Sequence, residues 1–218
     1  ASDLNHPLLR RMTIEAPGTY HHSLVVANLA EAAAEAIGAN ATLCRVCAYF
    51  HDVGKLVKPE YFTENMSFER NPHEDLAPTM SALIIIAHVK EGVDLALKYK
   101  LNQRIIDIIQ EHHGTSLVYY FYKRALQMHE DARAGGKIMK MRPDDIPDVC
   151  EESFRYSGPK PQTKESAIVS LADAVESASR SLEKPTPAKI EQLVNDIIDQ
   201  RISDRQLDEC DLTLHDIR

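Results

Sequence analysis

The chain has 218 residues, which is long enough to bury a substantial core and lies within the usual range for one domain. Its 44% hydrophobic and 27% charged residues are typical of a globular protein, and the mean hydropathy of -0.32 gives no sign of a membrane environment. The formal net charge of -8 argues against a protein that binds nucleic acid polymers, because such proteins contact phosphates with clustered Lys and Arg. We therefore expect one soluble domain.

Neither a membrane span nor a disulfide framework is expected. The densest apolar stretch, residues 82–87, is far shorter than the roughly 18 residues that a spanning helix needs, and the N-terminus does not resemble a signal peptide. Four cysteines are too few for a disulfide framework at this length, so reduced thiols are expected. Cys44 and Cys47 have C-x-x-C spacing, but their apolar helical surroundings favour core packing. Because the sequence begins with Ala1, we expect it to belong to a longer protein.

Apolar residues recur at helical spacing in the first half of the chain. Helices are predicted over residues 23–37 and 41–53, and each stops at a glycine. The second helix carries His51 and Asp52 in its last turn. Prolines and a loss of periodicity then predict a long loop or lid with short helical turns over residues 56–77. Because long loops in compact domains are often functional, this segment is expected to border a site.

The second half of the chain is also predicted to be helical. The expected helices span residues 79–100, with a break near Gly92, and residues 103–113, 117–132, 163–182 and 187–202. Glycines and prolines predict a flexible loop over residues 133–147, and residues 183–218 are expected to form a C-terminal helical extension. Because no segment alternates apolar and polar residues as a strand does, we predict a single all-α domain over residues 1–218.

Histidines and aspartates are placed on or beside these predicted helices in a pattern that suits a metal site. The set is His21-His22, His51-Asp52, His88, His112-His113 and Asp173. Imidazole and carboxylate suit iron, manganese or zinc, and the absence of thiolates from the set favours a catalytic site over a structural one. Adjacent helical residues point about 100° apart, so His51 and Asp52 can approach a metal pair from the same side. Two metals can hydrolyse a phosphodiester without a Ser or Cys nucleophile.

Other residues are candidates for contact with a substrate. Lys55 follows His51-Asp52 closely, and its ammonium group is expected to donate to a phosphate oxygen; the alternative is a solvated lysine after a helix cap. Arg155 and Tyr156 are candidates for nucleotide contact, and the alternative there is a structured connection that presents Asp173. The aromatic run over residues 119–122 covers every face of a helix, so at least one ring is expected to be exposed for stacking on a base.

The order H…HD…H…HH…D resembles that of the binuclear HD phosphohydrolases. Several segments also resemble the cytoplasmic HD domain of bacterial seven-transmembrane HD proteins of the PgpH type, and together they span most of residues 19–176. They are TYHHSLVVANLAEAAAEAIGAN, AYFHDVGKL, NPHEDLAPTMSALIIIAHVKEGV, QEHHGTSLVYYFY and FRYSGPKPQTKESAIVSLADAVE. The LADAVE setting favours Asp173 as a ligand over Asp75, Asp94 and Asp107.

This resemblance implies an HD-domain helical bundle with a binuclear metal site. It implies an enzyme that opens cyclic di-AMP to linear 5'-pApA with a metal-activated hydroxide, using two divalent ions of iron or manganese, and so ends second-messenger signalling. The implied ligands are His22, His51, Asp52 and Asp173 for one metal and His88, His112 and His113 for the other, with Asp52 as the bridge. The resemblance also implies a soluble domain at the cytoplasmic face of the cell membrane in a membrane-embedded parent protein, and leaves a homodimer open.

Alternative functions remain to be weighed. Enzymes of the HD-GYP class act on cyclic di-GMP and typically show a GYP signature after the paired histidines, but here the residues are Gly114, Thr115 and Ser116. A nucleotidase or a guanosine tetraphosphate hydrolase is a more distant alternative. A non-catalytic module that senses a cyclic dinucleotide would be expected to lack several ligands, whereas every position of the pattern is filled here.

Overall fold

The computed structural model describes residues 4–66, 70–139 and 148–217, and in these ranges the chain forms helices and short 3-10 turns. The α-helices are α1 (Pro7–Glu15), α2 (Pro17–Ile37), α3 (Ala41–Phe50), α4 (Pro78–Lys98), α5 (Gln103–Glu111), α6 (Tyr119–Met139), α7 (Lys164–Ser179), α8 (Pro187–Ser203) and α9 (Leu214–Ile217). Within the described ranges β pairing is limited to one isolated bridge between Leu117 and Arg155. The prediction of an all-α fold is confirmed.

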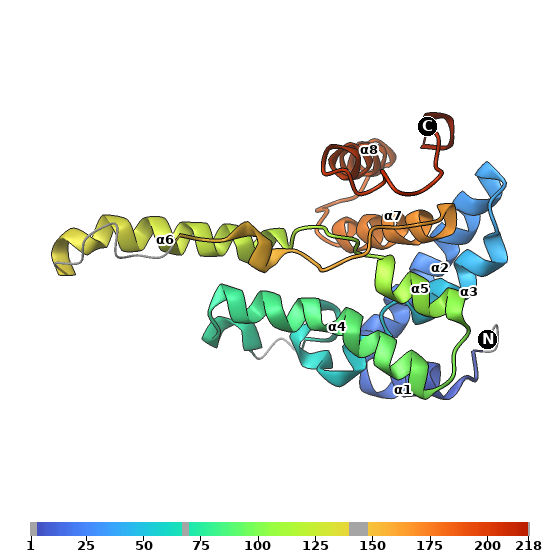
Figure 1. The fold of residues 1–218 in the computed structure, drawn as a ribbon, viewed down its shortest axis with the longest axis horizontal. Coiled ribbons are helices and arrows are strands. Elements are labelled where there is room, and N and C mark those ends of the chain that lie inside the picture. Colours follow the sequence, from blue (N-terminus) through green and yellow to red (C-terminus); the bar gives the residue numbers. More distant parts are fainter. Residues whose placement is uncertain (1–3, 67–69, 140–147, 218) are drawn as a thin grey trace.

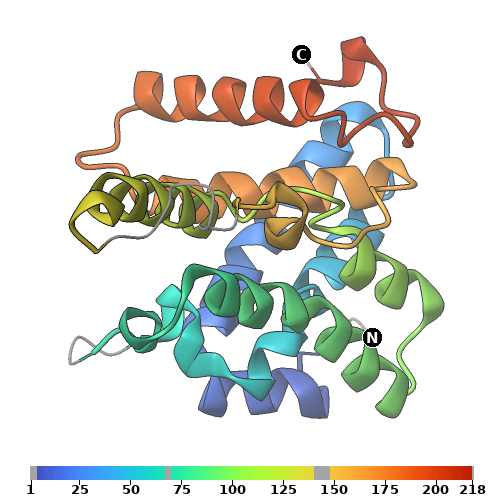
Figure 2. The same ribbon diagram turned by 60° about the vertical axis from the view of Figure 1, so that its left-hand side comes forward.

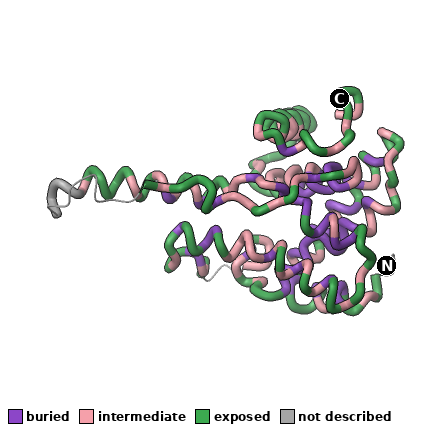
Figure 3. Tube along the Cα trace, in the orientation of Figure 1, coloured by how far each residue is buried: buried purple, intermediate pink, exposed green. Residues whose placement is uncertain are grey.

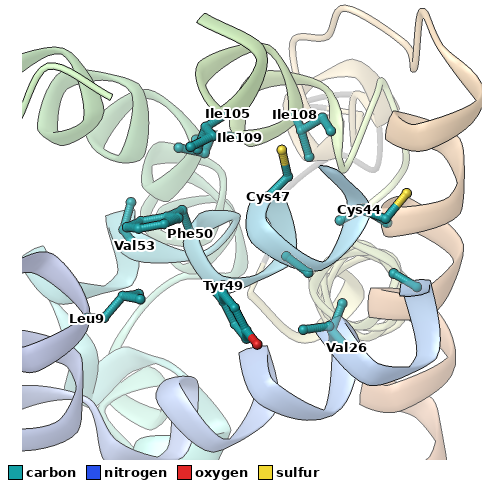
Figure 4. Close-up of a cluster of buried hydrophobic side chains, with 14 of the residues drawn as sticks. Leu9, Val26, Cys44, Cys47, Tyr49, Phe50, Val53, Ile105, Ile108 and Ile109 are labelled. Carbon is teal, nitrogen blue, oxygen red and sulfur yellow. The ribbon is translucent and has the colours of Figure 1, made fainter. Parts of the chain in front are cut away.

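The core lies where α2, α3, α5 and α7 pack together (Figure 4). Its side chains include Phe50 and Ile109, which are fully buried, and burying a side chain of this size stabilises the fold by about 1.5–3 kcal/mol. Cys44 and Cys47 are free thiols with no exposed surface in the same cluster, which confirms their assignment to core packing. Burial raises the pKa of each of these two thiols to about 12.

A short connection fixes the angle between α2 and α3. Helix α2 ends at Gly38, whose φ of 70° lies in the left-handed region that glycine tolerates, and the backbone amide of Gly38 points back to the last turn of α2. Asn40 then caps α3 by accepting a hydrogen bond of 3.0 Å from the backbone amide of Leu43. The two helices can therefore pack closely along their length, which brings His22 of α2 near the end of α3.

Two glycines bring the segment after α3 into backbone contact with α4. Residues Val53–Val57 form a 3-10 turn, η1, that crosses α4. A Cβ atom at Gly54 would overlap the carbonyl oxygen of His88, and one at Gly92 would lie 3.3 Å from the backbone nitrogen of Gly54. Helix α4 runs unbroken through Gly92, so the expected break is wrong: this glycine serves a close approach rather than a helix end.

The first elements of the chain differ from the sequence-based expectation. Helix α2 begins at Pro17 rather than at residue 23, and α1 precedes it as a separate helix that had not been predicted. Both helices carry a proline at their start, where its fixed φ is favourable and its missing amide costs nothing. The predicted loop after α3 is confirmed as a series of turns, namely η1, η2 (Pro59–Tyr61), η3 (Thr63–Asn65) and η4 (Pro72–Asp75), with residues 67–69 outside the described ranges.

Helix α6 projects from the body of the molecule (Figure 1), and much of its outer part is exposed (Figure 3). It continues to Met139, so residues 133–139 of the expected loop are helical, and residues 140–147 lie outside the described part of the chain. Glycine in a helix costs only about 1 kcal/mol relative to alanine, and no proline occurs between the start of α6 and Pro143. The adjacent Gly135 and Gly136 were therefore too weak a signal to end the helix.

The C-terminal helix α8 lies alongside α7 on the outer side of the bundle (Figure 2). Its N-terminus is capped by Thr186, whose side chain accepts a hydrogen bond from Lys189, and Pro187 occupies the first helical position. Among the described residues, no helix combines the length and the hydropathy needed to cross a bilayer.

Candidate metal centre

Five helices contribute the predicted metal ligands, and the fold brings all seven side chains together. Helix α2 carries His22, α4 carries His88 and α7 carries Asp173, whereas the other four residues follow the ends of α3 and α5. Helix α3 ends at Phe50, three residues before the predicted end, so His51 is its C-terminal cap and Asp52 follows in the turn. The side chain of His113 is 17% exposed and the other six are buried.

Asp52 lies at the centre of the cluster with its two oxygens directed to different histidines. Its Oδ2 atom is 3.4 Å from Nε2 of His22 and 3.3 Å from Nε2 of His51. Its Oδ1 atom is 3.3 Å from Nε2 of His88 and 3.5 Å from Nε2 of His112. A carboxylate that bridges two cations needs this division of its oxygens between two sets of ligands.

Asp173 completes the cluster on the side of His22 and His51. Its Oδ1 atom is 3.0 Å from Nε2 of His22 and 3.7 Å from Nε2 of His51, and its Oδ2 atom is 3.7 Å from Nδ1 of His113. Two groups have ligand atoms within 4.8 Å of one another: His22, His51, Asp52 and Asp173, and Asp52, His88, His112 and His113. These groups match the two ligand sets that the family resemblance implied.

The hydrogen bonding of the histidines fits divalent cations. The second ring nitrogen of three of them faces a backbone carbonyl: Nδ1 of His51 lies 2.7 Å from Ala48 O, Nδ1 of His88 lies 2.5 Å from Ile85 O, and Nδ1 of His112 lies 2.7 Å from Ile109 O. Each such bond selects the tautomer whose Nε2 atom is free to bind a metal.

Among the described residues, the inward-facing atoms of the cluster form no regular hydrogen bond, although Lys55 and Asp173 lie close to two of them. They are Nε2 of His22, His51, His88 and His112 and both carboxylate oxygens of Asp52, all buried. Leaving a buried polar group unsatisfied costs about 1–3 kcal/mol, so such a cluster without a ligand would be expensive for the fold. Coordination to two cations would satisfy all of them.

Glu176 and Arg180 extend the network behind His22. The carboxylate of Glu176 contacts Nδ1 of His22 in the interior, and Nη2 of Arg180 lies 3.3 Å from that carboxylate. Such partners orient a metal-binding imidazole and increase its basicity. Glu176 had not been singled out from the sequence, although its spacing of three residues from Asp173 on one helix was a readable signal that both side chains share a face.

The electrostatics of the cluster keep both aspartates ionised. Burial opposes the charge on Asp52, but Lys55 and His51 outweigh it and hold the pKa of this carboxyl well below its usual range. Asp173 likewise has a strongly lowered pKa, because the neighbouring imidazoles of His22 and His51 outweigh its burial. Both carboxylates are therefore charged at neutral pH and suited to cations.

The histidines divide according to their carboxylate contacts. Burial disfavours the charged form of His22 and His51, yet the neighbouring carboxylates raise the pKa of His22 to about 11 and that of His51 to about 9. For His112 and His113 burial prevails and the pKa is lowered. The side of the cluster that holds Asp173 thus carries more negative charge than the side that holds His88.

Lys55 is part of the buried network and not a solvated residue. Its Nζ atom lies 2.8 Å from Asp52 Oδ2 and 2.8 Å from Glu64 Oε1, and these carboxylates raise the pKa of the ammonium group despite its burial. The hydroxyl of Thr19 donates to the same Glu64 oxygen at 3.1 Å. Glu64 belongs to the predicted lid, so that segment supplies a side chain to the site, although the sequence gave no reason to select this particular residue.

Tyr156 and Arg155 have different surroundings. The ring of Tyr156 stacks on His113 with centroids 4.2 Å apart and an interplanar angle of 18°. Arg155 contacts Asp204 through two nitrogen–oxygen pairs of 3.1 Å and donates to the carbonyl of Thr115 at 2.9 Å. The guanidinium of Arg155 thus holds the loop after His113 against Asp204, and the residue also lines the cavity beside the cluster.

A cavity of about 1100 Å³ opens beside the cluster. Its lining includes Lys55, His88, His113, Tyr156 and Asp173. Rings from the aromatic run reach it as well. Tyr119 and Tyr120 are exposed and line the cavity, as predicted for at least one ring of the run, whereas Phe121 of the same helix is buried. The volume is slightly above the usual range of roughly 300–1,000 Å³ for small-molecule sites and is ample for a dinucleotide.

Comparisons with known proteins agree with this geometry. Residues 19–178 match the HD domain family. The chain is 49% identical over 216 residues to the cyclic-di-AMP phosphodiesterase PgpH of Bacillus subtilis, and 47% identical over 214 residues to the PgpH of Listeria monocytogenes. These matches cover 99% and 98% of the chain but only 28% and 27% of the two relatives, so the chain spans just over a quarter of their length.

A solved structure has the same fold. The crystal structure of the L. monocytogenes PgpH HD domain in complex with cyclic-di-AMP superposes with a TM-score of 0.86 at 46% identity, and the match covers 99% of this chain and 92% of that one. The family match extends over most of the chain and includes all seven residues of the cluster. This chain therefore belongs to the HD-domain family.

Proposed function

We propose that this domain is a metal-dependent phosphodiesterase that hydrolyses cyclic di-AMP to linear 5'-pApA and so ends second-messenger signalling. The observation that carries the proposal is Asp52, whose two buried oxygens face two separate groups of histidines. The choice of substrate is supported by the relatives named cyclic-di-AMP phosphodiesterase and by the HD domain solved with this ligand.

The proposed cofactors are two divalent ions of iron or manganese. One would be held by His22, His51, Asp52 and Asp173, and the other by His88, His112 and His113 together with Asp52. The donor set of imidazoles and carboxylates, without thiolates, suits these metals. When bound, such a pair supplies a water of lowered pKa and offsets negative charge on the phosphoryl oxygens.

The protein's own residues hold and orient the substrate in this proposal. Lys55 lines the cavity and keeps its charge, so its ammonium donates to a phosphoryl oxygen as negative charge develops. Glu64 positions that ammonium group from the lid. Tyr156 continues the surface of His113 into the cavity, where its ring face can contact the nucleotide.

The unit that carries this activity is proposed to be residues 1–218 as one domain. The C-terminal extension contacts the site, because the side chain of Gln206 accepts from the backbone amide of Thr115 at 2.9 Å and donates to the Thr115 hydroxyl at 3.0 Å. We further propose that the domain acts at the cytoplasmic face of the membrane within a longer protein, as the PgpH resemblance implies. The proposal is supported by the B. subtilis relative, of which the match covers only 28%.

Cyclic di-GMP is the main competing substrate, and a non-catalytic sensor is the competing class of protein. The residues after His113 are Gly114, Thr115 and Ser116 in place of a GYP signature, which disfavours the guanine ring. A sensor that had lost its metals would have no need for a buried cluster of inward-facing imidazole nitrogens and carboxylate oxygens, which disfavours the second alternative.

Competition between substrates tests the proposal directly. The manganese-loaded domain is incubated with equal concentrations of cyclic di-AMP and cyclic di-GMP, and the products are separated by chromatography. Cyclic di-AMP is expected to disappear faster with linear 5'-pApA as product. Asp52→Ala should lose both bound metal and hydrolysis, whereas the exposed Asp131→Ala on α6 should retain both. Faster cleavage of cyclic di-GMP, or an active and metal-replete Asp52→Ala variant, would contradict the proposal.

A further inference from the structure

Arg201 is a cation on the wall of the cavity for which the ligand set provides no role. It lies in the last turn of α8, in the C-terminal extension, and lines the same cavity as Lys55, His113 and Asp173. Its Nε atom is buried and has no hydrogen-bond partner among residues 4–66, 70–139 and 148–217. A partly buried guanidinium whose Nε atom lacks such a partner has a donor available for a ligand.

The nearby carboxylates are engaged with other groups. Asp204, one turn further along the chain, makes two contacts of 3.1 Å with the guanidinium of Arg155. Asp173 faces the imidazoles of His22 and His51. Burial lowers the pKa of Arg201, and these carboxylates only partly counter that effect, so the cation is incompletely compensated.

A purely structural explanation for Arg201 is the favourable position of a basic residue near the C-terminus of a helix. That effect requires only a charge near the last carbonyls and is weak at exposed sites. It does not account for a guanidinium that reaches the cavity and leaves a buried donor unpaired, which suits an anion in the cavity instead.

We propose that Arg201 binds the second phosphate of the cyclic dinucleotide, the one that is not cleaved, while Lys55 and the metal centre hold the first. A cyclic dinucleotide has two phosphodiesters, and a guanidinium can engage the two free oxygens of one of them through paired hydrogen bonds. This inference rests on the proposed function. It assigns substrate selectivity to α8, which would favour a ring with two phosphates over a phosphodiester with one.

The C-terminal region is anchored in a way that supports this role. Gln206 is buried and bonds to Thr115 in the loop after His113, and Arg155 ties the same loop to Asp204. Arg201 lies between these anchors and the body of α8, so the end of α8 that carries it is held near the paired histidines. The extension thereby becomes part of the substrate site.

The test compares a substrate that has two phosphodiesters with one that has a single phosphodiester. Arg201→Gln is assayed in the metal-loaded domain with cyclic di-AMP and with bis(4-nitrophenyl) phosphate, and binding of a bis-phosphorothioate analogue of cyclic di-AMP is measured by calorimetry. Losing a charged hydrogen-bond donor is expected to raise KM for cyclic di-AMP and Kd for the analogue by roughly 10- to 100-fold, with kcat nearly unchanged. Hydrolysis of bis(4-nitrophenyl) phosphate should stay unchanged.

Arg205→Gln is the matched control, because this arginine lies at the same end of α8 but its side chain is 79% exposed and paired with Asp208. It should resemble the parent domain in every measurement. Arg201→Lys keeps the positive charge but loses the paired donors of the guanidinium, so a smaller rise in KM is expected. This second variant decides the matter if circular dichroism shows that Arg201→Gln does not fold.

Two results would overturn the role of Arg201: an unchanged affinity for the analogue in a folded variant, or an equal loss of activity on both substrates. Failure of the proposed function has a different signature. In that case the parent domain would cleave bis(4-nitrophenyl) phosphate but leave cyclic di-AMP intact, while the binding measurements would still report on Arg201.

Discussion

The contact between Gly54 and α4 allows a sharp test of how the fold builds the site. Gly54→Ala adds a Cβ atom that overlaps the carbonyl of His88 and lies 2.5 Å from the backbone nitrogen of Gly92. Ordinary contact begins at 3.4 Å, so the Gly92 contact alone requires the turn and α4 to part by about 0.9 Å, and the overlap with the His88 carbonyl requires more. Metal–ligand distances tolerate only about 0.2 Å, and the shift acts directly between Asp52 and His88. Metal binding by the group that contains His88 is therefore expected to be lost or greatly weakened.

The stability of the variant should fall as well. Overpacking of this kind costs about 1–3 kcal/mol, which corresponds to about 2–12 °C in Tm for a chain of this size. Metal content by elemental analysis and Tm by circular dichroism measure the two effects. Gly135→Ala is the control, because a Cβ atom there meets nothing within 4 Å, and alanine should stabilise α6 by up to about 1 kcal/mol. A Gly54→Ala variant with two metals per chain and an unchanged Tm would refute the reasoning.

Three further outcomes are expected. Glu176→Gln should weaken metal binding roughly 10- to 100-fold, measured by competition with a chelating dye, because His22 loses the carboxylate that orients it; unchanged affinity would mean that the contact is incidental. Removal of metal by a chelator should lower Tm and restoration of manganese should recover it, since each site filled at about a thousand times its Kd adds about 4 kcal/mol. In alkylation at pH 8 followed by mass spectrometry, the exposed thiol of Cys150 should react at once, whereas Cys44 and Cys47 should wait for unfolding; equal rates would contradict their burial.

The helices were largely predictable because their ends carry local signals. Gly38, Pro78 and Pro187 mark boundaries through backbone geometry that depends on one or two residues. Errors arose where a tertiary contact changed the meaning of a residue. Gly92 indicated a break by propensity, but in the fold it allows α4 to touch the turn that carries Gly54. No local pattern contains that information.

The candidate ligands were predictable for a related reason. Their spacing along the chain is characteristic of the HD pattern, and each lies on an element whose existence could be inferred from periodicity. Glu64 and Arg201 carried no such signal, because a single Glu in a loop or Arg at a helix end is usually solvated. Their significance depends on which elements pack around the cavity, and only the folded structure supplies that arrangement.

The distribution of ligands has a consequence for folding as well as for chemistry. The seven side chains come from five helices that span residues 22 to 173, so two bound cations would connect most of the bundle. Without cations, the four buried imidazole nitrogens and the Asp52 carboxylate form no regular hydrogen bond among the described residues, and this acts against the native state. A cation that binds the folded chain and not the unfolded one adds its binding free energy to stability. Cations bound at this cluster would therefore tie the stability of the whole domain to metal supply, and the chelation experiment should report on the fold and on the site together.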